Sequence, residues 1–201
     1  MISVLKSKII LAASLFFVAA VVLVTVVVYP AMAKPQLQLV PAAASISAAD
    51  REEFVIDVCL TDLPDNNYPA ASISVEFDRN KLEFVGVKQG NMMTEDGSGG
   101  FDIPVWSCNP EVSNRKGQIN AMYLDMTAGD RAYVLAGYNK QNANVLLRLT
   151  FKLRDSATKG DSLKFTVQDA AVATVGGDVD NTSLSTAAKT LNTKNCSIKI
   201  D

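Results

Sequence analysis

The stretch ISVEFDRNKLEFVGV, residues 73–87, contains two runs of alternating apolar and polar residues joined by four polar ones. Alternation with a period of two is typical of a β-strand that has one face in a core and the other in water. The four joining residues, Asp78 to Lys81, have the composition of a turn. The stretch therefore predicts two strands connected by a structural turn, and not a catalytic loop.

The same pattern recurs along the rest of the chain, where apolar alternation is interrupted by segments rich in Gly, Asn, Asp and Pro. Further strands are predicted over residues 38–40, 53–60, 101–108, 118–126, 145–153, 163–168 and 196–200. Eight or nine short strands with little helical periodicity indicate an all-β fold, an antiparallel sandwich or barrel. In a sandwich of this kind two sheets bury their apolar faces against each other.

The beginning of the chain contains an uninterrupted apolar run, residues 9–28, which Lys6 and Lys8 precede. This run is long enough to span a bilayer as a helix and longer than the usual apolar core of a signal peptide. The triplet Ala31-Met32-Ala33 follows it and has the small-x-small pattern of a processing site. Cleavage is favoured over a retained anchor.

This segment gives the predicted organisation of the chain. Residues 1–33 are a signal peptide or signal anchor that contains one hydrophobic helix, residues 34–38 are a linker, and residues 39–201 are the β-sandwich domain. Either interpretation places the domain outside the cytoplasm, secreted or at the cell surface. The only predicted contact with a membrane is through residues 9–28, if they are not removed.

Composition excludes several classes of function. The chain has no histidine, so it lacks the imidazole base of Ser-His-Asp and Cys-His relays. Its formal net charge of −2 gives no general attraction to nucleic acid. The three cysteines, Cys59, Cys108 and Cys196, are too far apart in sequence for a CxxC zinc site. They allow one internal disulfide at most, and the alternative is three buried or half-buried thiols.

Acidic residues are the remaining candidates for chemistry. The pairs that could serve glycoside hydrolysis are Glu52/Glu53, Asp125/Asp130 and Asp178/Asp180. The first two pairs lie at strand starts or loop edges, where acids are usually solvated, so no catalytic residue is assigned. The oxygen atoms of Asp178, Asp180 and Asn181 are candidate ligands for calcium, and the alternative is a polar turn after Gly176-Gly177. No other cofactor is expected.

Four aromatic residues could stack on sugar rings if a flat sheet face brings them together. They are Trp106, Tyr123, Tyr133 and Tyr138. For Trp106 the favoured interpretation is packing in the core or against a loop. Tyr133 and Tyr138 lie in a polar segment, which is compatible with exposure.

Four stretches taken together resemble a known family, the cohesin domain, which in cellulosomal scaffolds binds dockerins. They are FVIDVCL (54–60), SISVEFDRNKLEFVGV (72–87), GQINAMYLDMTAGD (117–130) and NVLLRLTFKLRDSATKGDSLKF (144–165). The resemblance covers residues 37–201 in the order of the family. It implies a nine-stranded jelly-roll sandwich and a non-catalytic role, with a dockerin-like protein partner in a polysaccharide-degrading or cell-surface assembly.

The resemblance also implies where a partner binds, because in cohesins one sheet face receives the dockerin helices. Ala70 and Ser72 stand where some family members carry Asn and Asp. Met122 suits an apolar contact, and Asp125 suits an acidic one. The predicted partner-binding residues are Ser72, Ser74, Glu76, Met122 and Asp125.

Two other functions remain open from the sequence. The first is a carbohydrate-binding module, whose partner would be a polysaccharide. The second is a structural subunit of a surface or membrane assembly, held by an uncleaved N-terminal helix.

Overall fold

The structure is a computed structural model that describes most of the chain after residue 33. The described residues are 34–64, 66, 68–92, 94–95, 106–125, 132–133, 144–174 and 183–201. The hydrophobic helix predicted over residues 9–28 lies outside these ranges. Among the described helices, none has the length and apolar character that spanning a bilayer requires.

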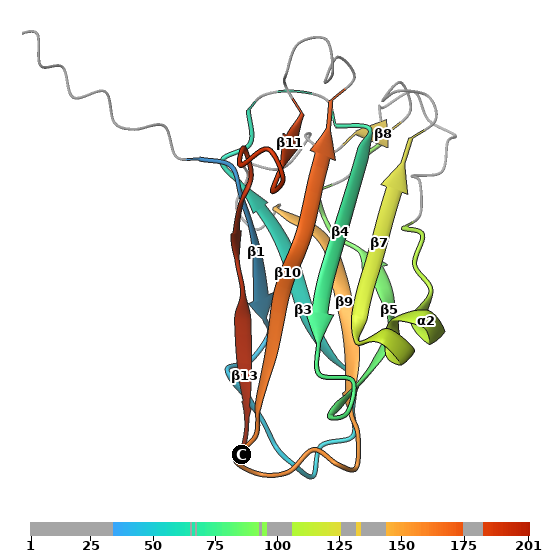
Figure 1. Ribbon diagram of the computed structural model, residues 1–201, viewed down its shortest axis with the longest axis vertical. Coiled ribbons are helices and arrows are strands. Elements are labelled where there is room, and N and C mark those ends of the chain that lie inside the picture. Colours follow the sequence, from blue (N-terminus) through green and yellow to red (C-terminus); the bar gives the residue numbers. More distant parts are fainter. Residues whose placement is uncertain are drawn as a thin grey trace, which may run out of the picture. The chain divides into compact units, whose positions relative to one another are not determined.

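Two β-sheets face each other across one hydrophobic core (Figure 1). The first sheet has the order β12-β1-β3-β9-β5, with β12 Asn192–Lys194, β1 Gln36–Pro41, β3 Phe54–Thr61, β9 Val145–Leu153 and β5 Leu82–Gln89. The second has the order β2-β13-β10-β4-β7, with β2 Ser45–Ile46, β13 Cys196–Ile200, β10 Ser162–Ala173, β4 Ala70–Phe77 and β7 Gln118–Leu124. The predicted β-sandwich is confirmed.

Short strands complete the described part and explain why the expected count of nine strands is not confirmed. β11 (Leu184–Ser185) pairs with β10, and β6 (Thr94–Glu95) pairs with β8 (Ala132–Tyr133). Thirteen strands are described, and four of them have only two residues. A strand of two residues contains no alternation, so a pattern of period two cannot reveal it.

The sheets are mixed, whereas an antiparallel sandwich was expected. β12 runs parallel to β1, and β2 runs parallel to β13. Both parallel pairs join the beginning of the domain to its end. Alternation of apolar and polar residues identifies a strand but does not give its direction. Because the paired strands are far apart in sequence, no hairpin forces them to be antiparallel.

The centre of the core is a cluster of phenylalanine rings around Phe151 on β9. In the first sheet Phe151 is the register partner of Phe54 on β3 and of Phe84 on β5. From the second sheet, Phe77 and Phe165 approach it with ring centroids 5.4 Å and 5.0 Å away. Phe151 is 0% exposed, so its ring contacts both layers of the sandwich.

Of the strand predicted over residues 101–108, the structure describes only residues 106–108, and these are not part of a named strand. Residues 101–105 lie outside the described ranges, and only Ser107 pairs with a strand, through a bridge to Met122. The chain then forms a helix, α2 (Pro110–Lys116), which was not predicted.

Local sequence signals explain α2. The side chain of Asn109 accepts a hydrogen bond from the backbone N–H of Val112 at 3.0 Å, which caps the first turn. Pro110 begins the helix, and Gly117 ends it with a φ of 74°, a conformation that glycine adopts without strain. Asn114 of α2 also exchanges two hydrogen bonds of 2.8 Å with the backbone of Phe84, which fixes the helix to β5.

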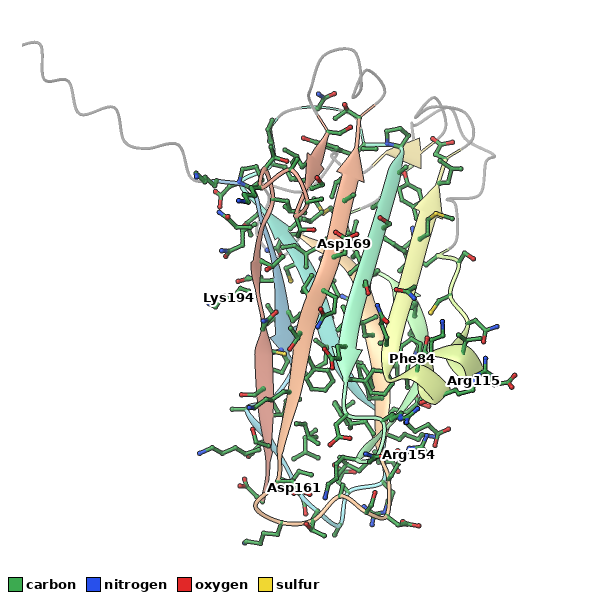
Figure 2. All side chains as sticks on the ribbon, in the orientation of Figure 1. Phe84, Arg115, Arg154, Asp161, Asp169 and Lys194 are labelled. Carbon is green, nitrogen blue, oxygen red and sulfur yellow. The ribbon has the colours of Figure 1, made fainter. Side chains whose placement is uncertain are left out.

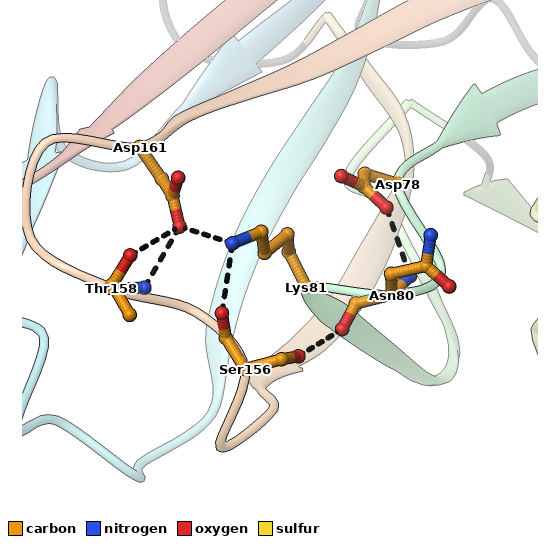
Figure 3. A network of polar contacts seen from close by, with 6 residues as sticks. All are labelled: Asp78, Asn80, Lys81, Ser156, Thr158 and Asp161. Carbon is orange, nitrogen blue, oxygen red and sulfur yellow. Dashed lines mark hydrogen bonds and ion pairs between the residues drawn. The ribbon is translucent and has the colours of Figure 1, made fainter.

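The turn predicted at residues 78–81 connects β4 in one sheet to β5 in the other, and polar contacts hold it in place (Figure 3). Lys81 donates to the carbonyl of Ser156 at 2.8 Å and forms an ion pair of 2.7 Å with Asp161. The same carboxylate accepts hydrogen bonds from the backbone and the hydroxyl of Thr158. The turn is therefore tied to the loop between β9 and β10, and its charged residues have a structural role.

This network predicts a pH-dependent contribution to stability. Hydrogen bonds from Lys81 and Thr158 lower the pKa of Asp161 in the folded state. Its ionised form therefore stabilises the fold above the unfolded pKa of about 3.9, and that stability is lost as the pH falls through the folded pKa. We expect Asp161→Asn to melt below the wild type at pH 7, with a difference that disappears near pH 2.

Thermal melts followed by circular dichroism at a series of pH values check this. The matched control is Asp155→Asn, because the Asp155 side chain is fully exposed in the same loop and its distance to Arg51 is 3.7 Å. A constant difference in melting temperature between Asp161→Asn and the wild type from pH 7 to pH 2 would contradict the assignment.

Candidate functional site

The outer face of β10, β4 and β7 is the candidate functional site, and we call it the docking face. It is the face of the second sheet that points away from the core and toward the viewer in Figure 1. Alternation along each strand decides which side chains it carries. On β4 they are Ala70, Ser72, Ser74 and Glu76, and on β7 they are Gln118, Asn120, Met122 and Leu124.

Strand register brings four of the predicted partner-binding residues together on this face. Ser72 is opposite Met122 on β7 and opposite Ala171 on β10. Ser74 and Glu76 follow Ser72 along β4, each two residues further on. These four residues therefore form one continuous surface.

The fifth predicted residue, Asp125, lies elsewhere. It follows the end of β7 on the inner side of the sheet and is 4% exposed. Its backbone N–H donates to the carbonyl of Pro69 at 2.7 Å. The neighbouring Tyr123 is also buried, and burial together with the negative charge of Asp125 raises the pKa of Tyr123. The carboxylate of Asp125 thus belongs to the interior and not to the docking face.

A groove of about 670 Å³ runs along the middle of the docking face, beside β7. Its outer wall is the segment before α2, because backbone hydrogen bonds of 2.7 Å and 3.0 Å pair Ser107 with Met122. The residues that line it are Ser72, Ile73, Ser74, Ser107, Cys108, Asn109, Asn120, Ala121, Met122 and Asp169. Sequence reasoning did not identify Asn120 or Asp169, although both are polar residues within predicted or adjoining strands.

Hydrogen bonds fix the orientation of the polar side chains in this groove. Gln118 donates from its amide to the hydroxyl of Ser74 at 2.7 Å. The hydroxyl of Thr186 donates to the carboxylate of Asp169, which lies half-way along β10 (Figure 2). Side chains fixed in this way lose less conformational entropy when a partner binds.

One end of the docking face is apolar. Met122 is 53% exposed and Leu124 is 49% exposed, although large apolar side chains are usually buried. With Ala70, Ala171 and Ala173 they border a shallow hollow of about 160 Å³. We call these five residues the apolar end.

The outer face of the other sheet has a different character. Arg148 and Asp57 form an ion pair of 3.3 Å, and Lys152 and Glu53 form one of 3.5 Å. Exposed ion pairs of this kind are typical of a solvated surface and contribute little to stability. This arrangement also accounts for Glu53, a member of one of the acid pairs considered for catalysis.

The cysteines are thiols and not a disulfide. All three are free: Cys59 lies in β3, Cys196 lies in β13 and Cys108 lies beside the groove. Burial raises the pKa of Cys59 and of Cys196 to about 11, so both are protonated and poorly nucleophilic at neutral pH. Burial also raises the pKa of Cys108. The interpretation as buried or half-buried thiols therefore holds.

The other sequence candidates gain no support from the described residues. The three candidate calcium ligands, Asp178, Asp180 and Asn181, lie outside the described ranges. Within those ranges no cluster of three His, Cys, Asp or Glu side chains could hold a metal ion. Trp106 packs against Tyr123 with ring centroids 5.7 Å apart, as favoured. The exposed large apolar side chains of the described part are Val40, Val85, Met122 and Leu124, which include no aromatic ring for a sugar platform.

Several cohesins are among the solved structures that this chain resembles in fold. The sixth cohesin of Acetivibrio cellulolyticus scaffoldin B, in complex with a Cel5 dockerin mutant, is 18% identical with a TM-score of 0.57, over 84% of this chain and 100% of that chain. The OlpA cohesin of Clostridium thermocellum, in a type I cohesin–dockerin complex, is 16% identical with a TM-score of 0.58, over 83% and 99%. A non-cellulosomal cohesin from Archaeoglobus fulgidus is 16% identical with a TM-score of 0.53, over 84% and 92%.

At such low identity these structures show the fold alone. No curated protein matches the sequence. The family model described as the cohesin domain matches residues 43–192, which is most of the chain and covers most strands of both sheets, with β1 and β13 outside the match. The chain belongs to the cohesin domain family.

Proposed function

We propose that this chain is a non-catalytic docking module that binds a dockerin-like protein through its docking face. The observation that carries the proposal is the apolar end, where Met122 and Leu124 lie side by side on an open sheet face. Adjacent exposed apolar residues rimmed by polar ones are typical of protein interaction sites. The similar cohesins that were solved in complex with dockerins support the choice of partner.

The proposal assigns a role to each residue of the predicted set. Met122 supplies the apolar contact, and Ser72 and Ser74 supply short polar side chains that let a partner approach the sheet closely. Glu76, whose carboxylate accepts a hydrogen bond from Gln168, lies at the far end of the same strand. Asp125 supports the end of β7 from inside and makes no direct contact.

Export is part of the proposal, with the domain secreted or displayed at the cell surface within a larger assembly. The apolar run at residues 9–28 supports it. Intact-mass analysis of the protein from its host separates a chain that begins at Lys34 from one that keeps its anchor, and detection of the folded domain in the cytoplasm alone would contradict export.

Met122→Glu is expected to weaken capture of a dockerin at least tenfold, about 1.4 kcal/mol. The reason is that a charge at the centre of the apolar end must be desolvated when the partner covers it. Binding is measured by surface plasmon resonance with immobilised chain and a panel of purified dockerin modules, after circular dichroism has shown that the variant is folded.

The matched control is Val85→Glu, which places the same charge at an exposed apolar position of the other sheet. It should bind as the wild type does. If Met122→Glu binds as well as the wild type, the docking face is wrong; if the wild type binds no dockerin of the panel, the assignment to dockerins is wrong.

A further inference from the structure

We propose that the docking face is polarised along its strands, so that it binds a helical partner segment with apolar residues at one end and acidic residues at the other, in one orientation. This inference rests on the proposed function and specifies the chemistry of the partner. Its basis is a second groove, at the opposite end of the docking face from the apolar end.

The second groove has a volume of about 480 Å³ and is formed where β4 ends and where β7 and β10 begin. Arg79 from the turn after β4, Lys116 from the last turn of α2 and Lys164 from β10 line it, and all three side chains are exposed. We call these three residues the cationic end. Two acids, Glu76 and Asp78, line the same groove.

Neutral groups hydrogen-bond to three of the five charged side chains of this groove, and one of the three is Arg79, which donates to the backbone carbonyl of Arg115. Glu76 accepts a hydrogen bond from Gln168, and Asp78 accepts one from the backbone N–H of Asn80 at 2.9 Å. Lys116 and Lys164 form no ion pair and no hydrogen bond with the described residues. The groove therefore has three cations against two acids, a net charge of +1, and Lys116 and Lys164 are available to pair with an incoming carboxylate.

The spacing of the two ends indicates the length of the partner segment. Along β4, Ala70 at the apolar end and Glu76 at the cationic end are six residues apart, which in a strand is about 20 Å. An α-helix covers about 20 Å with about 13 residues, so a helix of three to four turns spans the whole face.

The surface between the ends suits a helix. Between them β4 presents the small side chains of Ser72 and Ser74, and Ser74 lies between Asn120 on β7 and Asp169 on β10, whose carboxylate accepts a hydrogen bond from Thr186. Small residues along a strand let a helix approach the sheet closely and pack its larger side chains against the border. Acidic residues in the first turn of such a helix are additionally stabilised by its dipole.

Two synthetic helical peptides of about 16 residues test this inference. Both have Leu and Ile in the last turn; one has three Glu in the first turn, and the other has three Lys there. We expect the full-length chain to bind the Glu peptide at least tenfold more tightly than the Lys peptide in fluorescence anisotropy titrations at low salt. The difference should shrink as ionic strength rises.

Charge-reversal variants identify the residues that cause the preference for the Glu peptide. Lys116→Glu with Lys164→Glu should remove or invert the preference for the Glu peptide. Lys88→Glu is the matched control, because Lys88 is an exposed lysine of β5 in the other sheet. It should leave the preference unchanged.

The outcomes separate this inference from the proposed function. Equal binding of the two peptides, or no effect of the double reversal, overturns the polarity of the face. Binding of a dockerin without binding of either peptide also overturns it and leaves the proposed function standing. Selective binding of the Glu peptide without capture of any dockerin supports the polarity and overturns the assignment to dockerins.

Discussion

Phe151→Ala is expected to lower the free energy of unfolding by about 3–5 kcal/mol, the usual cost of removing a buried phenylalanine ring. The cost is at the upper end of the range for core substitutions because the ring of Phe151 is 0% exposed and contacts four other rings. These rings are Phe54, Phe77, Phe84 and Phe165. Two of these rings come from each sheet. The cavity would therefore open between the layers, where neither sheet can close it by a small shift.

Urea unfolding followed by tryptophan fluorescence and circular dichroism measures this loss. For a domain of this size, the loss corresponds to a fall of about 10 °C in the melting temperature. Phe151→Leu is the control, because it keeps an apolar side chain at the position and should cost clearly less. A loss below about 1.5 kcal/mol for Phe151→Ala would show that the ring cluster is not the centre of the core.

Gly90→Ala is expected to destabilise the domain by about 3 kcal/mol, although it adds one methyl group. A Cβ at Gly90 would lie 1.8 Å from the carbonyl oxygen of Val145, an atom of the backbone that cannot rotate away. The two segments are also joined by hydrogen bonds, from Gly90 to Leu146 and from Met92 to Val145, each 3.1 Å long. The methyl group can be accommodated only if these bonds lengthen and the beginning of β9 moves.

Gly86→Ala gives the matched control in the same strand region. A Cβ at Gly86 meets no atom within 4 Å, so its effect should remain within about 0.5 kcal/mol. Hydrogen exchange of the amides of residue 90 and Met92, the donors of these two bonds, shows where the damage lies, and both should exchange faster in Gly90→Ala. Equal stability of the two alanine variants would mean that the two segments are not in close contact.

Long uninterrupted alternation was the most reliable guide to the fold. The strand predicted over residues 145–153 is β9, with the same limits. The strand predicted over residues 163–168 is part of β10, which continues to Ala173 past a bulge between Val167 and Asp169. The bulge adds one residue and shifts the phase of alternation, so the pattern ends before the strand does.

The docking face could be predicted in part. Met122 and Asp125 were assigned to the same surface through resemblance, but they are three residues apart in a strand, and an odd separation places side chains on opposite faces. The alternation of side chains along β7 was the signal that would have placed Met122 and Asp125 on different faces. The cationic end was beyond sequence reasoning, because its three residues come from a turn, a helix end and a strand that only the fold brings together.

The side chain of Asn114 affects how two copies of the protein can associate at high concentration. Its amide offers the main chain of Phe84 one donor and one acceptor, as a neighbouring strand would. The outward-facing backbone N–H and C=O of Phe84 on the edge strand β5 are therefore already hydrogen-bonded, and a strand of another copy cannot pair with β5 at this residue. The helix α2 thus protects this edge of the first sheet against edge-to-edge aggregation.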